Sequence, residues 1–348
     1  MERGQDIYRF SVGSDRIKRG AATKRTINDG DDARPGSAVR KGSAYAVAAS
    51  VLCILAAAGA ACSFTAAETL VTSYLAHEPI VISGDAELTD ENGVTGGSGT
   101  PEDPFLIEGW KIDISGSTYQ SPTGIHIQHT SASLVIRDIM VHSGSLDSYE
   151  NSSTGILLYG VENCVIENTR TLNNTEGIYL IDSAYITVEG CDSRDNAGNG
   201  VTAERSTDLS ISNNTFAQNA HSGIALHDCV DSLIYGNSAT DNDGFGIDVR
   251  GSEDIEVCNN MVSRNLIGVN VGYSSDVAVT DNLISENRQA IVVYASEDIV
   301  YEPNTLLDNE IDLSGQEEGG LPIIGVVAAV AAVVGMVAVV LVWRRRAG

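Results

Sequence analysis

An all-β fold of stacked parallel coils is the fold class that this sequence predicts, and three observations support it. Short glycine-led segments that alternate apolar and variable residues recur along the middle of the chain. They recur at nearly constant spacing, and asparagine returns at fixed offsets from them. Gly is plentiful, with 35 residues, while aromatic residues make up only 5% of the chain. This composition is typical of many short strands joined by tight turns.

The glycine-led segments set the repeat length. The first interval is 31 residues, because of an insertion at about 142–153, and all later intervals are 22 or 23 residues. Alternation with period two indicates strands that turn one face inward. The segments begin at Gly124, Gly155, Gly177, Gly200, Gly223, Gly246, Gly268 and Ala290.

Each repeat contains two further short strands. A second alternating run follows the glycine, as in Leu209–Ile211 and Ile255–Val257, and a third apolar position comes later, as at Phe216 and Val262. One such coil cannot bury its own apolar face, so coils must stack into parallel sheets around a narrow aliphatic core. Because parallel crossovers are nearly always right-handed, we predict a single right-handed parallel β-helix over residues 79–315.

Asparagine marks two corners of every coil. Asn tolerates the left-handed backbone conformation that sharp corners need, and like side chains in successive coils can pass amide hydrogen bonds along the stack. We therefore predict two asparagine ladders. One ladder comprises Asn214, Asn237, Asn260, Asn282 and Asn304, and the other comprises Asn174, Asn196, Asn219, Asn242, Asn265, Asn287 and Asn309.

The C-terminal region predicts a membrane anchor. Leu321–Trp343 is uncharged and long enough to cross the bilayer as a helix. Arginines at 344–346 follow it directly, and the positive-inside rule places such a tail in the cytoplasm and the β-helix outside. Residues 316–320 are expected to be an acidic linker, and 344–348 a basic cytoplasmic tail.

The N-terminal region predicts a second hydrophobic segment. Residues 1–43 are a basic leader, expected to be disordered and cytoplasmic, and residues 44–67 are an Ala-rich apolar stretch. This stretch is either a cleaved signal peptide or an uncleaved signal anchor, and both interpretations send the following residues across the membrane.

Charge excludes one class of partner. The net charge is −26, and most basic residues lie in the leader and the C-terminal tail, so the middle of the chain is strongly acidic. Nucleic-acid binding requires a basic stripe that this part lacks. We expect the membrane, glycans or envelope proteins as partners.

The repeats resemble the parallel β-helix repeats of pectate-lyase-like proteins, of the carbohydrate-binding and sugar-hydrolase (CASH) domains and of NosD-like proteins. The stretches Pro79–Ile82 and Asn92–Trp110 are similar to the lead-in of archaeal NosD-like surface proteins. This resemblance implies a β-helix on the cell surface and leaves the activity open, because the fold hosts many functions. We expect residues 79–123 to cap the first coil, with Phe105 and Trp110 covering its open edge.

One column of outward positions is the best candidate site. Stacking brings Glu204, His227 and Arg250 to neighbouring heights, as candidates for general acid–base chemistry. Four residues nearby are candidates for ligand binding: Asp248, Asn270, Tyr273 and Tyr294. The alternative is a solvated ladder, because outward positions of a sheet are ordinarily polar and charge pairs on adjacent strands stabilise it.

Metal binding has little support in the sequence. Asp241, Asp243 and Asp248 are spaced loosely like calcium ligands, but the repeated Gly-rich calcium nonapeptide is absent. Copper follows only from the NosD resemblance, with the histidines at 126, 129 and 142 as candidate ligands. We predict no metal site and no cofactor, and keep calcium only as an open alternative.

The sequence leaves the function between two classes. The first is a non-enzymatic, membrane-anchored surface module that binds carbohydrate or protein. The second is a polysaccharide lyase or glycoside hydrolase that uses Glu204, His227 and Arg250; a copper-related assembly factor is a further alternative. The scarcity of basic residues in the body argues against an enzyme. Asn151, in the insertion, is the expected glycosylation site among three Asn-x-Ser/Thr tripeptides.

Overall fold

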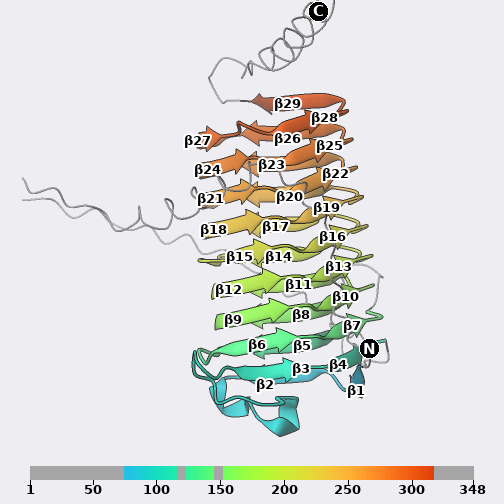
Figure 1. Ribbon diagram of the computed structural model, residues 1–348, viewed down its shortest axis with the longest axis vertical. Coiled ribbons are helices and arrows are strands. Elements are labelled where there is room, and N and C mark those ends of the chain that lie inside the picture. Colours follow the sequence, from blue (N-terminus) through green and yellow to red (C-terminus); the bar gives the residue numbers. More distant parts are fainter. Residues whose placement is uncertain (1–73, 116–121, 145–151, 317–348) are drawn as a thin grey trace, which may run out of the picture. The chain divides into compact units, whose positions relative to one another are not determined.

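A computed structural model describes residues 74–115, 122–144 and 152–316. The strands form three parallel sheets, and each coil contributes one strand to each sheet (Figure 1). Sheets A and B have ten strands each, and sheet C has nine. The predicted all-β solenoid of three-strand coils is therefore confirmed for these residues.

The strand bounds show the regularity of the winding. Sheet A consists of β1 Leu75–His77, β4 Trp110–Asp113, β7 Met140–His142, β10 Arg170–Leu172, β13 Asp192–Arg194, β16 Thr215–Ala217, β19 Ser238–Thr240, β22 Met261–Ser263, β25 Leu283–Ser285 and β28 Thr305–Leu307. Sheet B consists of β2 Ile80–Ser83, β5 Thr123–Gln128, β8 Thr154–Tyr159, β11 Glu176–Ile181, β14 Val201–Glu204, β17 Ile224–His227, β20 Phe245–Arg250, β23 Ile267–Gly272, β26 Gln289–Tyr294 and β29 Ile311–Gln316. Sheet C consists of β3 Phe105–Glu108, β6 Leu134–Arg137, β9 Glu162–Glu167, β12 Ala184–Glu189, β15 Ser210–Ser212, β18 Val230–Tyr235, β21 Glu253–Cys258, β24 Ser275–Thr280 and β27 Glu297–Val300.

The stretch expected to be a cap also supplies the first coil. Strands β2, β3 and β4 pair in parallel with β5, β6 and β7. The covering part is the segment between β2 and β3, which contains the two short 3-10 helices η1 (Asp85–Glu87) and η2 (Asp90–Asn92). Trp110 fastens this segment, because its indole Nε1 donates a hydrogen bond to the carbonyl of Gly93 at 2.9 Å.

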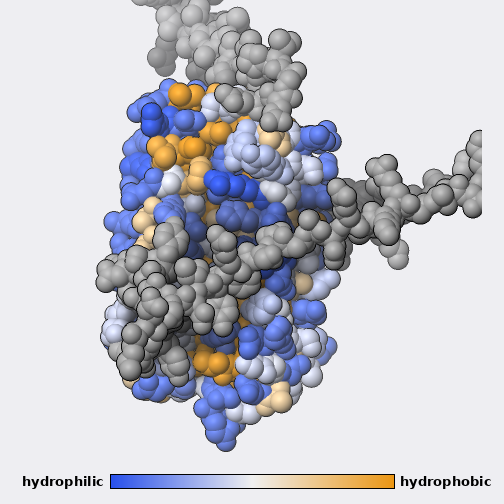
Figure 2. All heavy atoms as spheres, turned by 180° about the vertical axis from the view of Figure 1, so that it is seen from behind, coloured by the Kyte–Doolittle hydropathy of each residue, from blue (hydrophilic) through white to orange (hydrophobic). Residues whose placement is uncertain are grey.

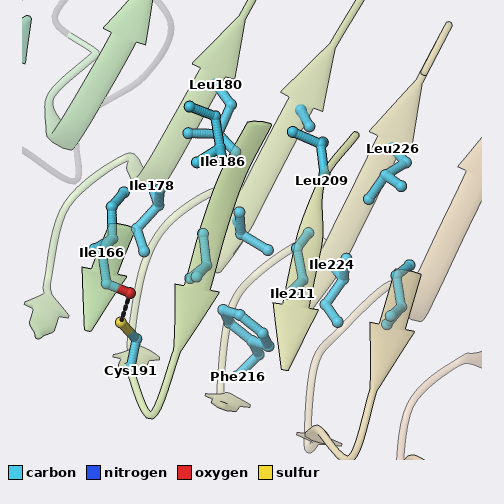
Figure 3. Packing of buried hydrophobic residues seen from close by; sticks show 14 of the residues in the cluster. Ile166, Ile178, Leu180, Ile186, Cys191, Leu209, Ile211, Phe216, Ile224 and Leu226 are labelled. Carbon is cyan, nitrogen blue, oxygen red and sulfur yellow. Dashed lines mark hydrogen bonds between the residues drawn. The ribbon is translucent and has the colours of Figure 1, made fainter. Parts of the chain in front are cut away.

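The core is a column of aliphatic side chains between the three sheets. Figure 3 shows Ile178 and Leu180 of β11, Ile211 of β15 and Phe216 of β16 pointing into the same interior. Phe216 is the largest fully buried side chain, and the coils near it balance its bulk with small residues such as Ala239 and Ala203. Burial of this column stabilises the stack by roughly 25 cal/mol per Å² of apolar surface removed from water.

Both asparagine sets form continuous hydrogen-bonded ladders in the structure. In the first, the backbone N–H and the Nδ2 of Asn214 both donate to Asn237 Oδ1, at 3.0 and 2.9 Å. In the second, Asn219 donates in the same way to Asn242. The second Nδ2 hydrogen satisfies a backbone carbonyl of an earlier strand, as between Asn237 and Ile211. The ladder side chains thus replace strand pairing at a corner, where the sheet cannot continue. Asn174, at the start of the second ladder, takes part only through its backbone N–H, which donates to Asn196 Oδ1, and its own side-chain amide has no hydrogen-bond partner among the described residues.

The left-handed conformation predicted for the ladder asparagines belongs instead to the residue before them. This holds at every ladder position except Asn304, which follows Pro303; examples are Asn213 (φ 56°) before Asn214 and Asp241 (φ 58°) before Asn242. The ladder asparagines themselves do not have positive φ. Asn is therefore required at the ladder positions because its amide group forms the hydrogen bonds between coils. The left-handed backbone conformation belongs to the preceding residue.

A third ladder, which the sequence analysis missed, occupies the corner after sheet B. There the backbone N–H of Ser183 donates to Ser206 Oγ at 3.1 Å, and Ser252 donates likewise to Ser274. Cys229 takes one serine position in this ladder and donates its N–H to Ser252. The four cysteines of the described residues are all buried and free. The sequence does not single out these serines as a ladder, because serine is common at solvated turns.

Several predicted segments lie outside the described residues. These are the leader 1–43, the apolar stretch 44–67, the segment 321–343 and the tail 344–348. Within the ranges that the structure describes, no helix has the length and hydropathy of a membrane span. The side of the molecule opposite to that in Figure 1 is mostly hydrophilic, with hydrophobic residues exposed between polar ones (Figure 2).

The ladder hydrogen bonds lead to a stability prediction. Replacing Asn237 by Leu removes its bonds to Asn260 and Ile211 and leaves the Asn214 donors without an acceptor in a buried corner. We expect the variant to lose about 3–5 kcal/mol of unfolding free energy, because several buried polar groups become unsatisfied. Urea unfolding followed by circular dichroism measures this loss. Ser210→Ala, on the outward side of the neighbouring β15, is the control and is expected to change stability by less than about 0.5 kcal/mol.

Candidate functional site

The outward face of sheet B carries the candidate residues, and the strand register arranges them in two columns. Glu204 on β14 pairs with His227 on β17, and His227 pairs with Arg250 on β20. A second column, two residues earlier in each strand, contains Thr202, Ala225, Asp248 and Asn270. The side chains in each column lie about 4.8 Å apart, the spacing of paired strands.

Asp248 is the centre of the strongest cluster on this face. Its side chain is only 4% exposed, yet it lies on the outward side of the sheet. Arg250 Nε donates to its Oδ1 at 3.0 Å, and Asn270 Nδ2 donates to the same oxygen at 2.7 Å. His227 Nε2 lies 3.5 Å from its Oδ2. A buried carboxylate is costly unless it is paired in this way, so Asp248 holds His227 and Arg250 side by side.

Glu204 belongs to a separate group of hydrogen bonds. Tyr179 Oη donates to Glu204 Oε1 at 2.8 Å, and Arg205 Nη1 donates to Oε2 at 3.1 Å. Arg205 also binds Asp182 through Nε and Nη2. Burial and the neighbouring Glu204 carboxylate raise the pKa of Tyr179. Glu204 is therefore next to His227 in the column, but its own hydrogen bonds connect it to β11.

The aromatic candidates lie at the other end of the cluster. Tyr273 is 69% exposed, and its ring meets that of Tyr294 edge-on, with centroids 5.3 Å apart. Arg250 lies over the ring of Phe245, with the guanidinium carbon 5.0 Å from the centroid. Exposed tyrosines beside charged hydrogen-bond donors offer both an apolar surface and polar anchors to a ligand.

Glu176 is a residue of this face that the sequence analysis overlooked. It begins β11, directly before Gly177, the regularly spaced glycine that starts this repeat. Its Oε2 accepts a hydrogen bond from Thr202 Oγ1 at 2.8 Å. Asn199 Nδ2 donates to the same threonine oxygen at 3.0 Å. Burial raises the pKa of the Glu176 carboxyl, against the opposing effect of hydrogen bonds that Glu176 itself accepts from Thr202 and Asn199. The sequence signal that could have identified Glu176 is its position directly before the repeat glycine, because the side chain at that position contacts the outward column of Thr202.

The arrangement offers groups for binding and for proton transfer. Arg250 is a fixed cation, His227 and Tyr294 can each donate or accept hydrogen bonds, and the Glu204 carboxylate can accept them. These are the residue types that anchor sugar hydroxyl and carboxylate groups. An imidazole oriented by a buried carboxylate is also a common arrangement in general acid–base catalysis.

The metal alternatives do not gain support from the geometry. Asp241 is bound in bidentate fashion by Arg264, at 2.6 and 2.7 Å, whereas Asp248 is held by Arg250 and Asn270 on another part of the coil. The loose calcium-like spacing therefore does not bring these carboxylates into one site. Over the part of the chain that the structure describes, no three His, Cys, Asp or Glu side chains gather into a group that could hold a metal ion.

The three histidines proposed for copper lie in separate surroundings. His126 is on β5, and burial lowers its pKa. His129 lies at a corner and meets the Tyr159 ring with centroids 5.0 Å apart. His142 ends β7 in sheet A, where its Nδ1 is 2.5 Å from Ser143 Oγ. Since copper prefers converging imidazole or sulfur ligands, these residues do not fit a copper site. Asn151, the expected glycosylation site, lies outside the described residues.

The raised pKa of Glu176 leads to a prediction about pH. Because the folded-state pKa lies above the unfolded one, the folded chain binds this proton more tightly, and the resulting stability is lost as pH rises through the folded pKa. Glu176→Gln should therefore unfold at a higher temperature than the unsubstituted chain at pH 7. The difference should disappear at acid pH, where the carboxyl is protonated in both states. Thermal unfolding followed across pH measures it, with the exposed Glu297→Gln as control; equal shifts in both variants would contradict the assignment.

Solved structures show what this fold is similar to. A point mutant of the periplasmic alginate epimerase AlgG superposes with a TM-score of 0.52 and 20% identity, covering 61% of this chain and 56% of that one. Tailspike protein 2 from an Escherichia coli bacteriophage superposes with a TM-score of 0.51 and 13% identity, covering 70% of this chain and 38% of that one. The chain thus spans about half or less of these proteins, and at such identities the likeness concerns the fold alone. A search among curated protein sequences found no match.

A family model gives the more specific result. The model described as "Periplasmic copper-binding protein (NosD)" matches residues 79–267 and 246–318. Together these ranges include every complete coil of the described β-helix and more than half of the chain. The chain therefore belongs to the NosD family.

Proposed function

We propose that this protein is an extracytoplasmic β-helix module that binds a glycan over the outward face of sheet B. The observation that carries the proposal is the cluster around Asp248, which fixes Arg250, His227 and Asn270 beside two tyrosines. A binding surface gains affinity when its polar groups are already held in place before the ligand arrives. The regular sheet beneath these residues provides that rigidity.

The mixture of side chains favours a carbohydrate over a protein ligand. Sugar rings present apolar faces, which pack on tyrosine, and hydroxyl groups, which need paired donors and acceptors. Charged residues here are already neutralised by their neighbours, as Arg250 is by Asp248 and Arg205 is by Asp182. Protein interfaces instead place a larger apolar centre inside a polar rim.

Extracytoplasmic placement rests on the family and on the sequence. The family model is described as periplasmic, and the apolar segment 321–343 with its following arginines is expected to anchor the chain with the right-handed β-helix outside. Copper handling, which the family description names, is not part of the proposal, because the described histidines do not converge.

A second candidate function is cleavage of the same glycan, by a lyase or a glycoside hydrolase reaction. It is favoured by one observation, the orientation of His227 by the buried Asp248 next to Arg250. General acid–base catalysis needs such a positioned imidazole within reach of the reacting proton. Turnover distinguishes this candidate from binding alone.

Glycan binding is tested with the full chain in mild detergent on an array of defined oligosaccharides. We expect binding to one glycan class and a loss of at least tenfold in affinity in the variant with Glu204, His227 and Arg250 all replaced by alanine, because the polar anchors are removed. The control replaces Arg264, which binds Asp241 elsewhere on the coil, by alanine. Absence of binding by the unsubstituted chain to any glycan would contradict the proposal.

Catalysis is tested on the glycan that binds. Reducing ends and unsaturated products are measured after prolonged incubation with the unsubstituted chain and with the triple variant. Binding with no product supports the non-enzymatic module. Product formation that the His227→Ala substitution abolishes supports the second candidate.

The anchor predicts a change in cell fractionation. In a chain whose residues 1–67 are replaced by a cleavable signal peptide, ending after Gly315 removes the segment 321–343, so we expect this shortened chain to leave the membrane fraction. The same chain with 321–343 retained should stay there and resist extraction by carbonate. A full chain that is released by carbonate would contradict the anchor. A chain in which 344–348 alone is removed is the matched control and should remain in the membrane.

A further inference from the structure

Gly272 interrupts the outward column at the position after Arg250. In the strand register, Gly272 on β23 pairs with Arg250 on one side and with Tyr294 on the other. Every neighbour of Gly272 along this column from Glu204 to Tyr294 carries a long side chain. The column therefore has a single gap, and it lies between Arg250 and Tyr294.

The Tyr294 ring fills this gap. A Cβ atom built on Gly272 would lie 2.3 Å from Tyr294 Cζ, 2.5 Å from its Oη and 2.7 Å from Cε1. All three are atoms at the far end of the tyrosine, so the ring extends from β26 across β23, in the direction of β20. Its phenol group is thereby brought toward the strand that carries Arg250 and Asp248.

The gap is not explained by backbone conformation. Gly272 does not have positive φ, unlike Gly251 (φ 60°) or Gly160 (φ 61°) at the corners. Inside the coil, Gly268 must be glycine for another reason, because a Cβ there would lie 2.6 Å from the backbone oxygen of Ala290. At Gly272 the obstructing atoms belong to a movable side chain, so alanine is compatible with the fold.

We infer that Gly272 is a positioning residue, whose missing side chain lets Tyr294 lie next to Arg250 as a stacking surface for a sugar ring. The inference rests on the proposed glycan binding and adds the residue that sets the place of the aromatic surface. Tyr273, which meets Tyr294 edge-on, supports the ring from the exposed side. A pyranose ring lying on Tyr294 would then have the partly exposed Arg250 guanidinium within reach of its hydroxyl groups, with Arg250 held in place by the buried Asp248.

The test is a double-mutant cycle on the full chain with the oligosaccharide that the array selects. Gly272→Ala should displace the Tyr294 ring and weaken binding roughly tenfold or more, as expected when a central aromatic contact is lost. Tyr294→Ala should weaken binding to the same extent. In the Tyr294→Ala background, adding Gly272→Ala should change affinity by less than about twofold, because the two substitutions remove one interaction.

Two further measurements separate positioning from a general loss of structure. The near-ultraviolet circular dichroism of tyrosine should change in Gly272→Ala, while the urea midpoint should stay within the error of the unsubstituted chain. Tyr159→Ala is the matched control, because Tyr159 lies in the same outward column on β8, where its ring meets His129 edge-on and its register partners are Gln128 and Ile181; its affinity should be unchanged.

The outcomes distinguish this inference from the proposal on which it rests. Gly272→Ala with an altered tyrosine signal and unchanged affinity would overturn the positioning role and leave glycan binding intact. Independent, additive losses from Gly272→Ala and Tyr294→Ala would also overturn it. If the unsubstituted chain binds no oligosaccharide, both the proposed function and the inference fail.

Discussion

Alignment of like side chains at the corners of successive coils is the constraint on which the rest of this structure depends. A strand satisfies its backbone through pairing, but a corner interrupts pairing once in every third of a coil. Here an asparagine or serine side chain supplies the missing acceptor for the preceding coil, as Asn237 does for Asn214 and Ser206 does for Ser183. The left-handed backbone conformation at such a corner is confined to the residue before the ladder residue, such as Asn213 before Asn214. Because the coils from Asn174 to Asn309 repeat this solution, they keep one register along most of the described β-helix.

Because the register is fixed, outward residues that are far apart in the sequence form one defined surface on sheet B. Outward side chains of sheet B cannot drift relative to one another, since each strand is held by its neighbours on both sides and by the corner ladders. Asp248 uses that rigidity, because a buried carboxylate requires partners whose positions are fixed. Glu176 lies on the same face, and burial of its carboxyl group disfavours the charged form and raises its pKa. Perturbed and buried ionisable groups that gather on one face of an otherwise regular repeat are typical of functional sites.

Membership of the NosD family does not by itself assign an activity to these residues. The family model is described as copper-binding, but the three candidate histidines lie apart, with His126 in sheet B, His142 in sheet A and His129 at a corner. What the described residues offer instead is a combination of paired charges, amide groups and tyrosines on one face. Such a surface fits a ligand rich in hydroxyl groups better than a soft metal ion.

The repeat spacing was enough to predict the three-strand coil, the aliphatic core and both asparagine ladders, because hydrophobic alternation and hydrogen-bonding corners are written in consecutive residues of the sequence. It also placed Glu204, His227 and Arg250 in one column, since register follows from repeat length. The sequence could not show that Asp248 is buried and binds Arg250, that Glu204 bonds to Tyr179 instead of His227, or that Tyr294 lies over Gly272. These features depend on side-chain directions and on contacts between residues about 22 or more positions apart, which only the tertiary structure determines.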